Sequence, residues 1–136
     1  MQINPYLHFD GRCEAAFRFY EQRFGGKIQM LLKHSESPEP QHVPEAWRNT
    51  VMHARMTIGD QVLLGSDCPP DYYHKPAGFY VSLDVATPAE ARRLYDALAQ
   101  DGEVNMPLQK TFWSASFAML RDRFGIPWMI NCTVAA

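Results

Sequence analysis

Apolar and polar positions follow the same order of periods twice along the chain. In the first half, residues 3–9 alternate loosely, as a strand does, and residues 13–24 carry apolar side chains at helical spacing. Residues 27–33 predict a second strand, and residues 49–58 and 61–66 predict a hairpin. The expected order is therefore βαβββ. The apolar positions of the predicted helix are Cys13, Ala16, Phe17, Tyr20 and Phe24.

The second half repeats this order with clearer boundary signals. Residues 78–85 predict a strand, and Thr87-Pro88-Ala89-Glu90 is a capping box with proline at the first helical position. A strand is expected over residues 104–108. Residues 117–120 and 128–130 predict a final hairpin, joined by a turn rich in aspartate, glycine and proline.

Short similarities between the halves indicate an internal duplication. Phe19-Tyr20-Glu21 in the first helix matches Leu94-Tyr95-Asp96 in the second, at an offset of roughly 75 residues. We therefore expect an α+β fold of two βαβββ modules with helices outside curled mixed sheets. The expected boundaries are a single domain over 1–136, with modules at 3–66 and 78–133 and a linker at 67–77.

Two segments, residues 34–47 and the linker at 67–77, fall outside the predicted elements. Residues 34–47 hold three prolines and read as a long loop. His34, His42 and His74 lie in loops, so we expect them to be exposed. Gly25-Gly26 closes the first helix, as glycines at helix C-termini do.

Composition narrows the class of protein. Apolar residues are 46% of the chain, enough for a core, and the net charge of −2 gives no electrostatic case for nucleic acid. The longest apolar runs are far below the ~18 residues of a membrane span. No segment resembles a secretory signal, so a cytoplasmic protein is expected.

The three cysteines do not form a recognisable metal or redox motif. Cys13 and Cys132 lie in apolar patterns and are expected in the core, while Cys68 lies in a loop and is expected to be more exposed. No C-x-x-C pair is present, so neither a zinc knuckle nor a redox dithiol is indicated.

Several blocks of sequence carry a family resemblance. They are Pro5-Tyr6-Leu7, Met52-His53-Ala54, Thr111-Phe112-Trp113 and the stretch from Asp122 to Asn131. With these blocks, the chain resembles the PhnB-like branch of the glyoxalase/bleomycin resistance/dioxygenase (vicinal oxygen chelate) superfamily over nearly its whole length. The resemblance implies strands curled into a half-open barrel around a small-molecule cavity, usually in a homodimer. It does not imply one chemistry, so function must be argued from the site.

The resemblance also implies a divalent metal held by His, Glu or Gln on the first and last strands of each module. The corresponding positions here are Pro5, Leu63, Phe79 and Met129, none of which supplies a hard oxygen or imidazole ligand. A shift of one residue does not restore a ligand set. We therefore expect no metal and no cofactor. The alternative is a metal held by His8 and His53.

Five side chains are candidates for binding a small molecule. His53 is either a hydrogen-bonded core histidine or a ligand-binding and proton-transfer group. Phe112 and Trp113 form either an aromatic wall for a ligand or a dimer contact. Tyr80, on the fifth predicted strand, can place its hydroxyl in the cavity. Asp67 either orients His53 or caps a turn, and the cap is favoured.

These features favour a metal-independent protein that binds an unknown small molecule, or a weakly specified enzyme. The sequence contains no Ser-His-Asp set, phosphate loop or dinucleotide motif. A methyltransferase would need a glycine-rich turn that starts a helix, whereas Gly25-Gly26 ends one. The rivals are a metal-dependent lyase, isomerase or dioxygenase using His8 and His53, and a purely structural dimer. The residues name neither a ligand nor a reaction.

Overall fold

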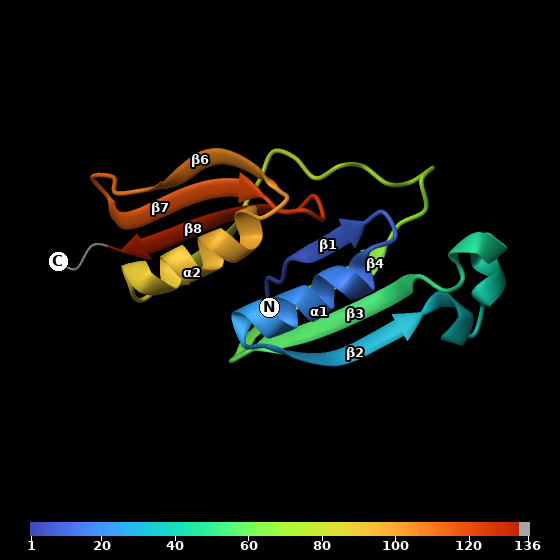
Figure 1. The fold of residues 1–136 in the computed structure, drawn as a ribbon. Helices are drawn as coiled ribbons and strands as arrows, with labels where there is room; N and C mark the ends of the chain where they lie inside the picture. The colour runs from blue at the N-terminus through green and yellow to red at the C-terminus, as the bar shows by residue number, and fades with distance from the viewer. Residues whose placement is uncertain (134–136) are drawn as a thin grey trace. The chain divides into compact units, whose positions relative to one another are not determined.

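The computed structural model describes residues 1–133, and the chain divides into two compact units between His74 and Lys75. Residues 134–136, the end of the predicted domain, lie outside the described residues. The first unit contains, in order, β1 (Tyr6–Phe9), α1 (Cys13–Phe24), β2 (Lys27–Lys33), β3 (Val51–Ile58) and β4 (Gln61–Asp67). The second contains β5 (Val81–Val85), α2 (Pro88–Ala99), β6 (Glu103–Gln109), β7 (Ser114–Arg121) and β8 (Pro127–Thr133) (Figure 1).

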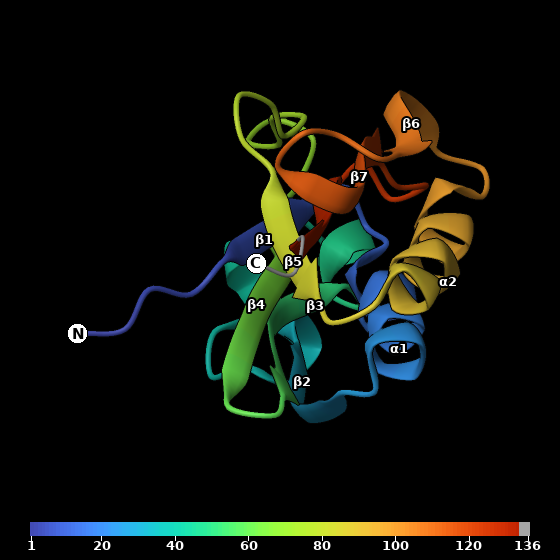
Figure 2. The same cartoon turned by 90° about the vertical axis from the view of Figure 1, so that its left-hand side faces the viewer.

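Each unit contains one mixed four-stranded sheet. The strand orders are β1-β4-β3-β2 and β5-β8-β7-β6. In both units the first and last strands pair in parallel, and the remaining pairs are antiparallel. Strands β1 and β4 lie side by side in both ribbon views (Figures 1 and 2). The prediction of an α+β fold with two βαβββ modules and curled sheets is confirmed.

One helix covers one face of each sheet. Helix α1 packs against β2, β3 and β4, and helix α2 packs against β6, β7 and β8. The contact in the first unit is close, because a Cβ added to Gly65 would lie 2.6 Å from Cε1 of Phe17. In the second helix Ala91, Leu94 and Leu98 are buried, and Tyr95, which has the same apolar spacing in the sequence, is partly buried. Within residues 1–133, α1 and α2 are the only α-helices, so neither sheet has an α-helix of its own unit on its other face.

The helix ends follow the sequence signals in part. The Thr87 side chain accepts a hydrogen bond from the Glu90 backbone N–H at 3.1 Å, which confirms the predicted N-cap. The other half of the capping box is absent, because the Glu90 carboxylate pairs with Arg93 instead. Gly25 has a φ of 68° at the C-cap of α1, so it ends that helix as expected.

Strands β1, β3 and β5 begin later than predicted, and β3 starts at Val51. Strand β1 starts at Tyr6, because Pro5 has no N–H to donate, although its carbonyl accepts the Leu64 N–H at 3.0 Å. Strand β5 starts at Val81, after Gly78 turns the chain with a φ of 81°. Tyr80 therefore precedes the fifth strand, where the sequence placed it within the strand.

The segment between β2 and β3 is more ordered than a polar loop suggests. It contains three short 3₁₀ turns, η1 (His34–Glu36), η2 (Pro40–His42) and η3 (Glu45–Trp47). Among the residues that the structure describes, no helix is long and apolar enough to cross a membrane.

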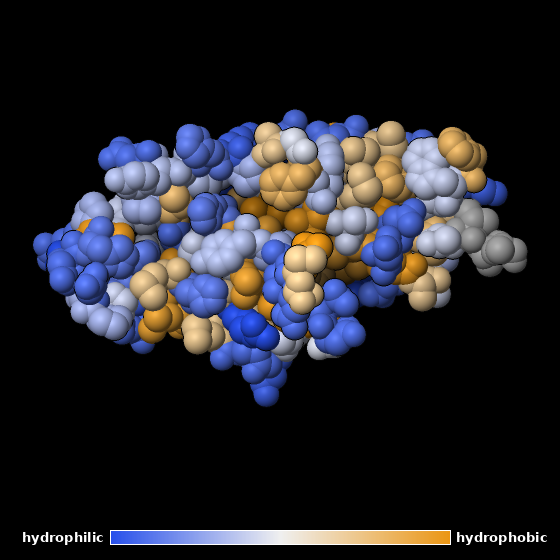
Figure 3. Space-filling view, turned by 180° about the vertical axis from the view of Figure 1, so that it is seen from behind, coloured by the Kyte–Doolittle hydropathy of each residue, from blue (hydrophilic) through white to orange (hydrophobic). Residues whose placement is uncertain are grey.

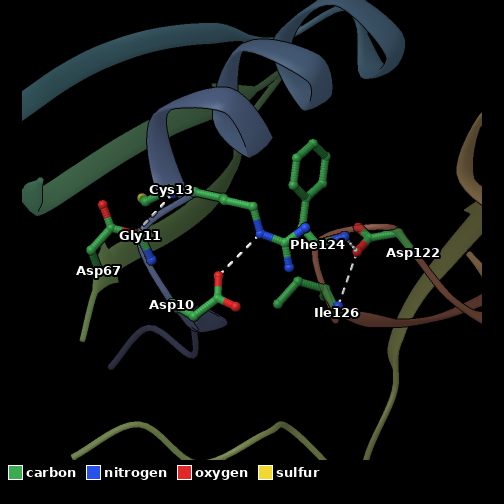
Figure 4. Close-up of polar contacts among 8 residues, drawn as sticks. Asp10, Gly11, Cys13, Asp67, Asp122, Phe124 and Ile126 are labelled. Carbon is green, nitrogen blue, oxygen red and sulfur yellow. Dashed lines mark hydrogen bonds and ion pairs between the residues drawn. The ribbon is translucent and has the colours of Figure 1, made fainter. Parts of the chain in front are cut away.

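The turn between β7 and β8 is organised around one buried carboxylate. Asp122 is 4% exposed, and its Oδ1 accepts hydrogen bonds from the backbone N–H groups of Phe124 at 2.8 Å and Ile126 at 3.0 Å (Figure 4). Its Oδ2 accepts a hydrogen bond from Trp128 Nε1 at 2.8 Å. The aspartate thereby joins the turn to the largest side chain of the core.

We predict that Asp122→Asn destabilises the protein by about 1–3 kcal/mol, because one acceptor oxygen becomes an NH₂ donor facing buried N–H groups. The measurement is the free energy of unfolding in urea. The matched control is Asp60→Asn, since Asp60 lies exposed in the turn between β3 and β4. An equal effect of the two substitutions would contradict this role.

Candidate functional site

The open face of the first sheet, defined as the side away from α1, carries Tyr6, His8, His53, Arg55 and Leu64. Strand alternation and register place them there, because Tyr6 pairs with Leu64, and Leu64 pairs with Arg55. Their neighbours along the strands face the helix and are buried; these are Leu7, Ala54 and Gly65. The open face therefore presents polar and aromatic side chains from three adjacent strands.

Tyr6 and His53 form the central pair of this face. The Tyr6 hydroxyl lies 3.1 Å from His53 Nδ1, and the two rings stack with centroids 5.7 Å apart. The edge of His8 lies against Tyr6, with ring centroids 5.6 Å apart. The structure thus brings both predicted histidines together. Tyr6 was missed as a site residue, although its alternation with His8 on a short strand is a signal that could have identified it.

The Tyr6–His53 contact leaves one imidazole nitrogen available. His53 Nε2 makes no hydrogen bond with a residue that the structure describes. If the Tyr6 hydroxyl donates to Nδ1, a neutral His53 carries its proton on Nε2 and can donate it to a ligand. If Nδ1 donates to the hydroxyl, Nε2 is an acceptor. The pair can therefore bind a polar group or hold a proton at Nε2.

Asp67 joins two elements of the first unit, the start of α1 and the start of β3. Its Oδ1 accepts hydrogen bonds from the N–H groups of Gly11 at 3.0 Å and Cys13 at 2.9 Å, at the start of α1 (Figure 4). Its Oδ2 accepts one from the N–H of Val51 at 2.9 Å. Burial raises the pKa of Asp67, while these three N–H groups act in the opposite direction. This geometry corresponds to the cap interpretation.

The remaining candidates lie in the second unit. Phe112 contacts Trp113 at a centroid distance of 4.7 Å, and Trp113 contacts Phe117 at 5.3 Å, both edge to face. Phe112 is 94% exposed, whereas Phe117 is buried. The three rings form a row from solvent to the sheet. The Tyr80 hydroxyl lies 3.4 Å from the side-chain oxygen of Asn105 on β6, so the curl of this sheet brings its two edges together.

Asn131 has an unused acceptor in the same unit. It pairs with Phe117 across β7 and β8, and its Nδ2 lies 3.4 Å from Asp84 Oδ1. Its Oδ1 is buried without a hydrogen-bond partner. A buried oxygen of this kind is normally satisfied by water or by a ligand donor. Asn131 therefore adds a polar contact point beside the aromatic row.

The donor set does not fit the divalent metal that the resemblance implies. Leu63 is buried and pairs with Met56 on the helix side, while Leu64 takes the open position beside Tyr6. His8 and His53 share a face, but Tyr6 already engages Nδ1 of His53. Among the described residues, no three His, Cys, Asp or Glu side chains gather closely enough to hold a metal ion.

His34 corrects the expectation that the loop histidines are exposed. It is only 5% exposed, and its Nδ1 lies 3.1 Å from His42 Nε2. His42 Nδ1 in turn contacts the Glu39 carbonyl. Because that carbonyl needs a donor, the neutral pair places its protons on both Nδ1 atoms, which leaves the buried His34 Nε2 without a partner. The polar composition of residues 34–47 gave no indication that His34 is buried.

The surroundings of Cys13 and Cys68 disfavour a reactive thiolate. Burial raises the pKa of Cys13 strongly, and the negative charges of Asp67 and Glu14 add to the shift. Burial also raises the pKa of Cys68. Cys13 and Cys132 are buried as predicted. Since the thiolate is the nucleophilic form, none of this favours cysteine chemistry.

Fold and site together define a class: a duplicated βαβββ protein with open curled sheets. The family model of the Glyoxalase/Bleomycin resistance protein/Dioxygenase superfamily matches residues 2–130, and the chain belongs to this superfamily. Protein YjdN from Escherichia coli (strain K12) is 31% identical over 139 residues, covering 96% of this chain and 95% of YjdN.

Two solved structures are similar over nearly the whole chain. Protein PA1353 from Pseudomonas aeruginosa has a TM-score of 0.90 and 46% identity, covering 98% of each chain. A putative 3-demethylubiquinone-9 3-methyltransferase, PhnB protein, from Bacillus cereus has a TM-score of 0.80 and 26% identity, covering 98% of this chain and all of that one. These likenesses support the superfamily fold and leave the chemistry to the site.

We predict that His34 makes stability depend on pH. Burial and the neighbouring His42 lower its pKa below the ordinary value of about 6.5, while Asp67 opposes this shift. The unfolded chain then binds the proton more tightly than the folded one. The stabilisation from neutral His34 is therefore complete above about pH 6.5 and is lost as the pH falls toward its folded-state pKa.

The test is the free energy of unfolding in urea at a series of pH values between about 5 and 8. In His34→Gln, the fall in the free energy of unfolding below about pH 6.5 is expected to be smaller. The control His74→Gln changes an exposed histidine and is expected to retain it. An unchanged slope in His34→Gln would refute the assignment.

Proposed function

We propose that this protein binds a small organic molecule on the open face of the first sheet, without a resident metal. The observation that carries the proposal is the Tyr6–His53 pair, which holds an imidazole with one nitrogen free for a ligand. Leu64 on β4 is the register partner of Tyr6. Met30 on β2, two strands away from β4, is 48% exposed. A polar anchor next to apolar surface is the usual composition of a small-molecule site.

The chemistry of the donor set favours this function over the metal-dependent lyase, isomerase or dioxygenase. A catalytic divalent metal needs about three protein ligands and an open position. The open face offers His8 and His53, with Tyr6 between them. A proton shared between Tyr6 and His53 can still support acid–base chemistry on a bound molecule. We therefore assign His53 the principal polar contact and Tyr6 its orientation.

For the second unit, taken by itself, we assign contact with a ligand on its own open face to Phe112, Trp113 and Tyr80. The aromatic row ending at Phe117 offers ring faces and edges, and the unpartnered Asn131 Oδ1 accepts a donor. Asp67 is excluded from ligand contact, because its two oxygens bind backbone groups of its own unit. In the purely structural alternative, Asn131 Oδ1 and His53 Nε2 would bind water instead of a ligand.

Methyl transfer is not carried over from the PhnB protein of Bacillus cereus. In this chain the glycine pair lies at the C-terminus of α1, where Gly25 adopts a left-handed conformation. A nucleoside-binding turn would require glycines at a helix N-terminus, where backbone N–H groups are free to bind anionic groups.

We also propose that the chain forms a two-fold homodimer and acts in the cytoplasm. Each sheet leaves one face without a helix, and hydrophobic residues reach the molecular surface (Figure 3). Exposed apolar side chains include Met30, Val104, Phe112 and Trp113. The three cysteines are unpaired, as in a reducing compartment. Light scattering at micromolar concentration is expected to give the mass of two chains. A monomeric mass would contradict the dimer.

The ligand assignment predicts that a screen of metabolites, quinones and aromatic compounds raises the melting temperature. A ligand at 100 times its Kd adds about 2.7 kcal/mol to stability. His53→Gln is expected to weaken binding of the discovered ligand about tenfold, the loss of one good hydrogen bond. Tyr6→Phe is expected to weaken it too, because it removes the hydrogen bond that orients His53. Tyr72→Phe, which removes an exposed hydroxyl, is the control and should not change affinity. Unchanged affinity in both site variants would refute the residue assignments.

The metal assignment predicts well under one divalent metal per chain in protein purified without chelator. Elemental analysis is the measurement. Stoichiometric zinc, nickel or manganese that is lost in His53→Ala would overturn this assignment and favour a metalloenzyme. His74→Ala serves as the matched control for nonspecific loss of histidine ligands.

A further inference from the structure

The four strands of the first sheet have a local charge opposite to that of the chain. The chain carries a net charge of −2, yet β1 to β4 contain one carboxylate, Asp67. That carboxylate is buried and accepts three backbone hydrogen bonds. The basic side chains of the same strands are Lys27, Lys33, Arg55, His8 and His53. Lys33 lies 4.0 Å from Glu14 of α1, so Lys27 and Arg55 are the cations of these strands without an acidic partner among the described residues.

Arg55 is the charged group at the centre of the open face. It pairs with Leu64 on one side and Met30 on the other, and Leu64 pairs with Tyr6. These four side chains form one row across all four strands. His53 lies two residues from Arg55 on the same face of β3, at a spacing of about 7 Å.

The Arg55 guanidinium is not paired with any residue of the described part of the chain. It is exposed and makes no ion pair or side-chain hydrogen bond with a residue that the structure describes. Other arginines are differently placed, since Arg12 pairs with Asp10 and Arg18 pairs with Glu14. A ligand would not have to displace an existing carboxylate in order to reach Arg55.

We infer that the molecule bound on the open face is a small organic oxyanion, a carboxylate or phosphate carried on an apolar or aromatic body. This inference rests on the proposed function. The planar guanidinium binds two oxygens of such a group at once. Leu64 and Met30 contact the apolar body. His53 Nε2 hydrogen-bonds a second polar group of the ligand, about one strand repeat away.

The test uses three aromatic probes that differ in charge: benzoate, phenyl phosphate and neutral benzamide. Each is titrated into the full chain while backbone amide NMR shifts are recorded. Both anions are expected to shift amides around Tyr6, His53 and Arg55 and to bind at least about tenfold more tightly than benzamide, the effect of a charge-assisted hydrogen bond. Raising the salt concentration is expected to weaken the binding of the two anions and to leave the binding of benzamide unchanged. The anion that binds more tightly identifies the head group of the ligand.

Arg55→Gln is expected to reduce the affinity for the anions at least about tenfold and leave that for benzamide unchanged. Arg18→Gln, on the exposed side of α1, is the matched control and should change neither. Equal binding of benzamide and the anions, or anion binding insensitive to Arg55→Gln, overturns the oxyanion inference and leaves small-molecule binding intact. Failure of all three probes and of the wider screen to bind overturns both.

Discussion

The buried carboxylate of Asp67 joins the parts of the first unit on which its open face depends. Located at the end of β4, it binds the N-terminus of α1 and the first residue of β3. Its backbone pairs with Phe9 at the end of β1. These contacts hold β1 and β3 on either side of β4, so Tyr6 and His53 meet across it. The Asp67 carboxylate, on the helix side of the sheet, thus supports the Tyr6–His53 contact on the open face.

The second unit shares the topology but places its buried carboxylate differently. Asp122 organises the turn between β7 and β8 and binds the Trp128 indole, while α2 is capped by its own Thr87. The open faces also differ in chemistry. The first carries imidazole and guanidinium groups, and the second carries an aromatic row beside Asn131 and Asp84. Duplication of a fold has therefore preserved strand order and not side-chain chemistry.

Superfamily membership accounts for the curled sheets and leaves function to the side chains. The positions that the resemblance associates with metal ligands hold residues without a hard oxygen or imidazole ligand, such as Leu63 and Met129. What remains on the first open face is a hydrogen-bonded histidine, an arginine with no ion-pair partner among the described residues, and the apolar side chain of Leu64 beside it. In the proposed function, this combination binds by charge and hydrogen bonding, so affinity depends on complementarity to the ligand.

The sequence by itself determined the elements, because helical and strand periods are local properties; α1 and β2 have the expected bounds, and βαβββ occurs twice. It also identified His53, Asp67 and Trp113 as candidates. Only the tertiary structure decided their partners. Tyr6 meets His53 because β1 pairs with β4, a contact between residues far apart in sequence. His34 is buried for the same reason: its environment is built by His42 and by the end of β4, which no local pattern encodes.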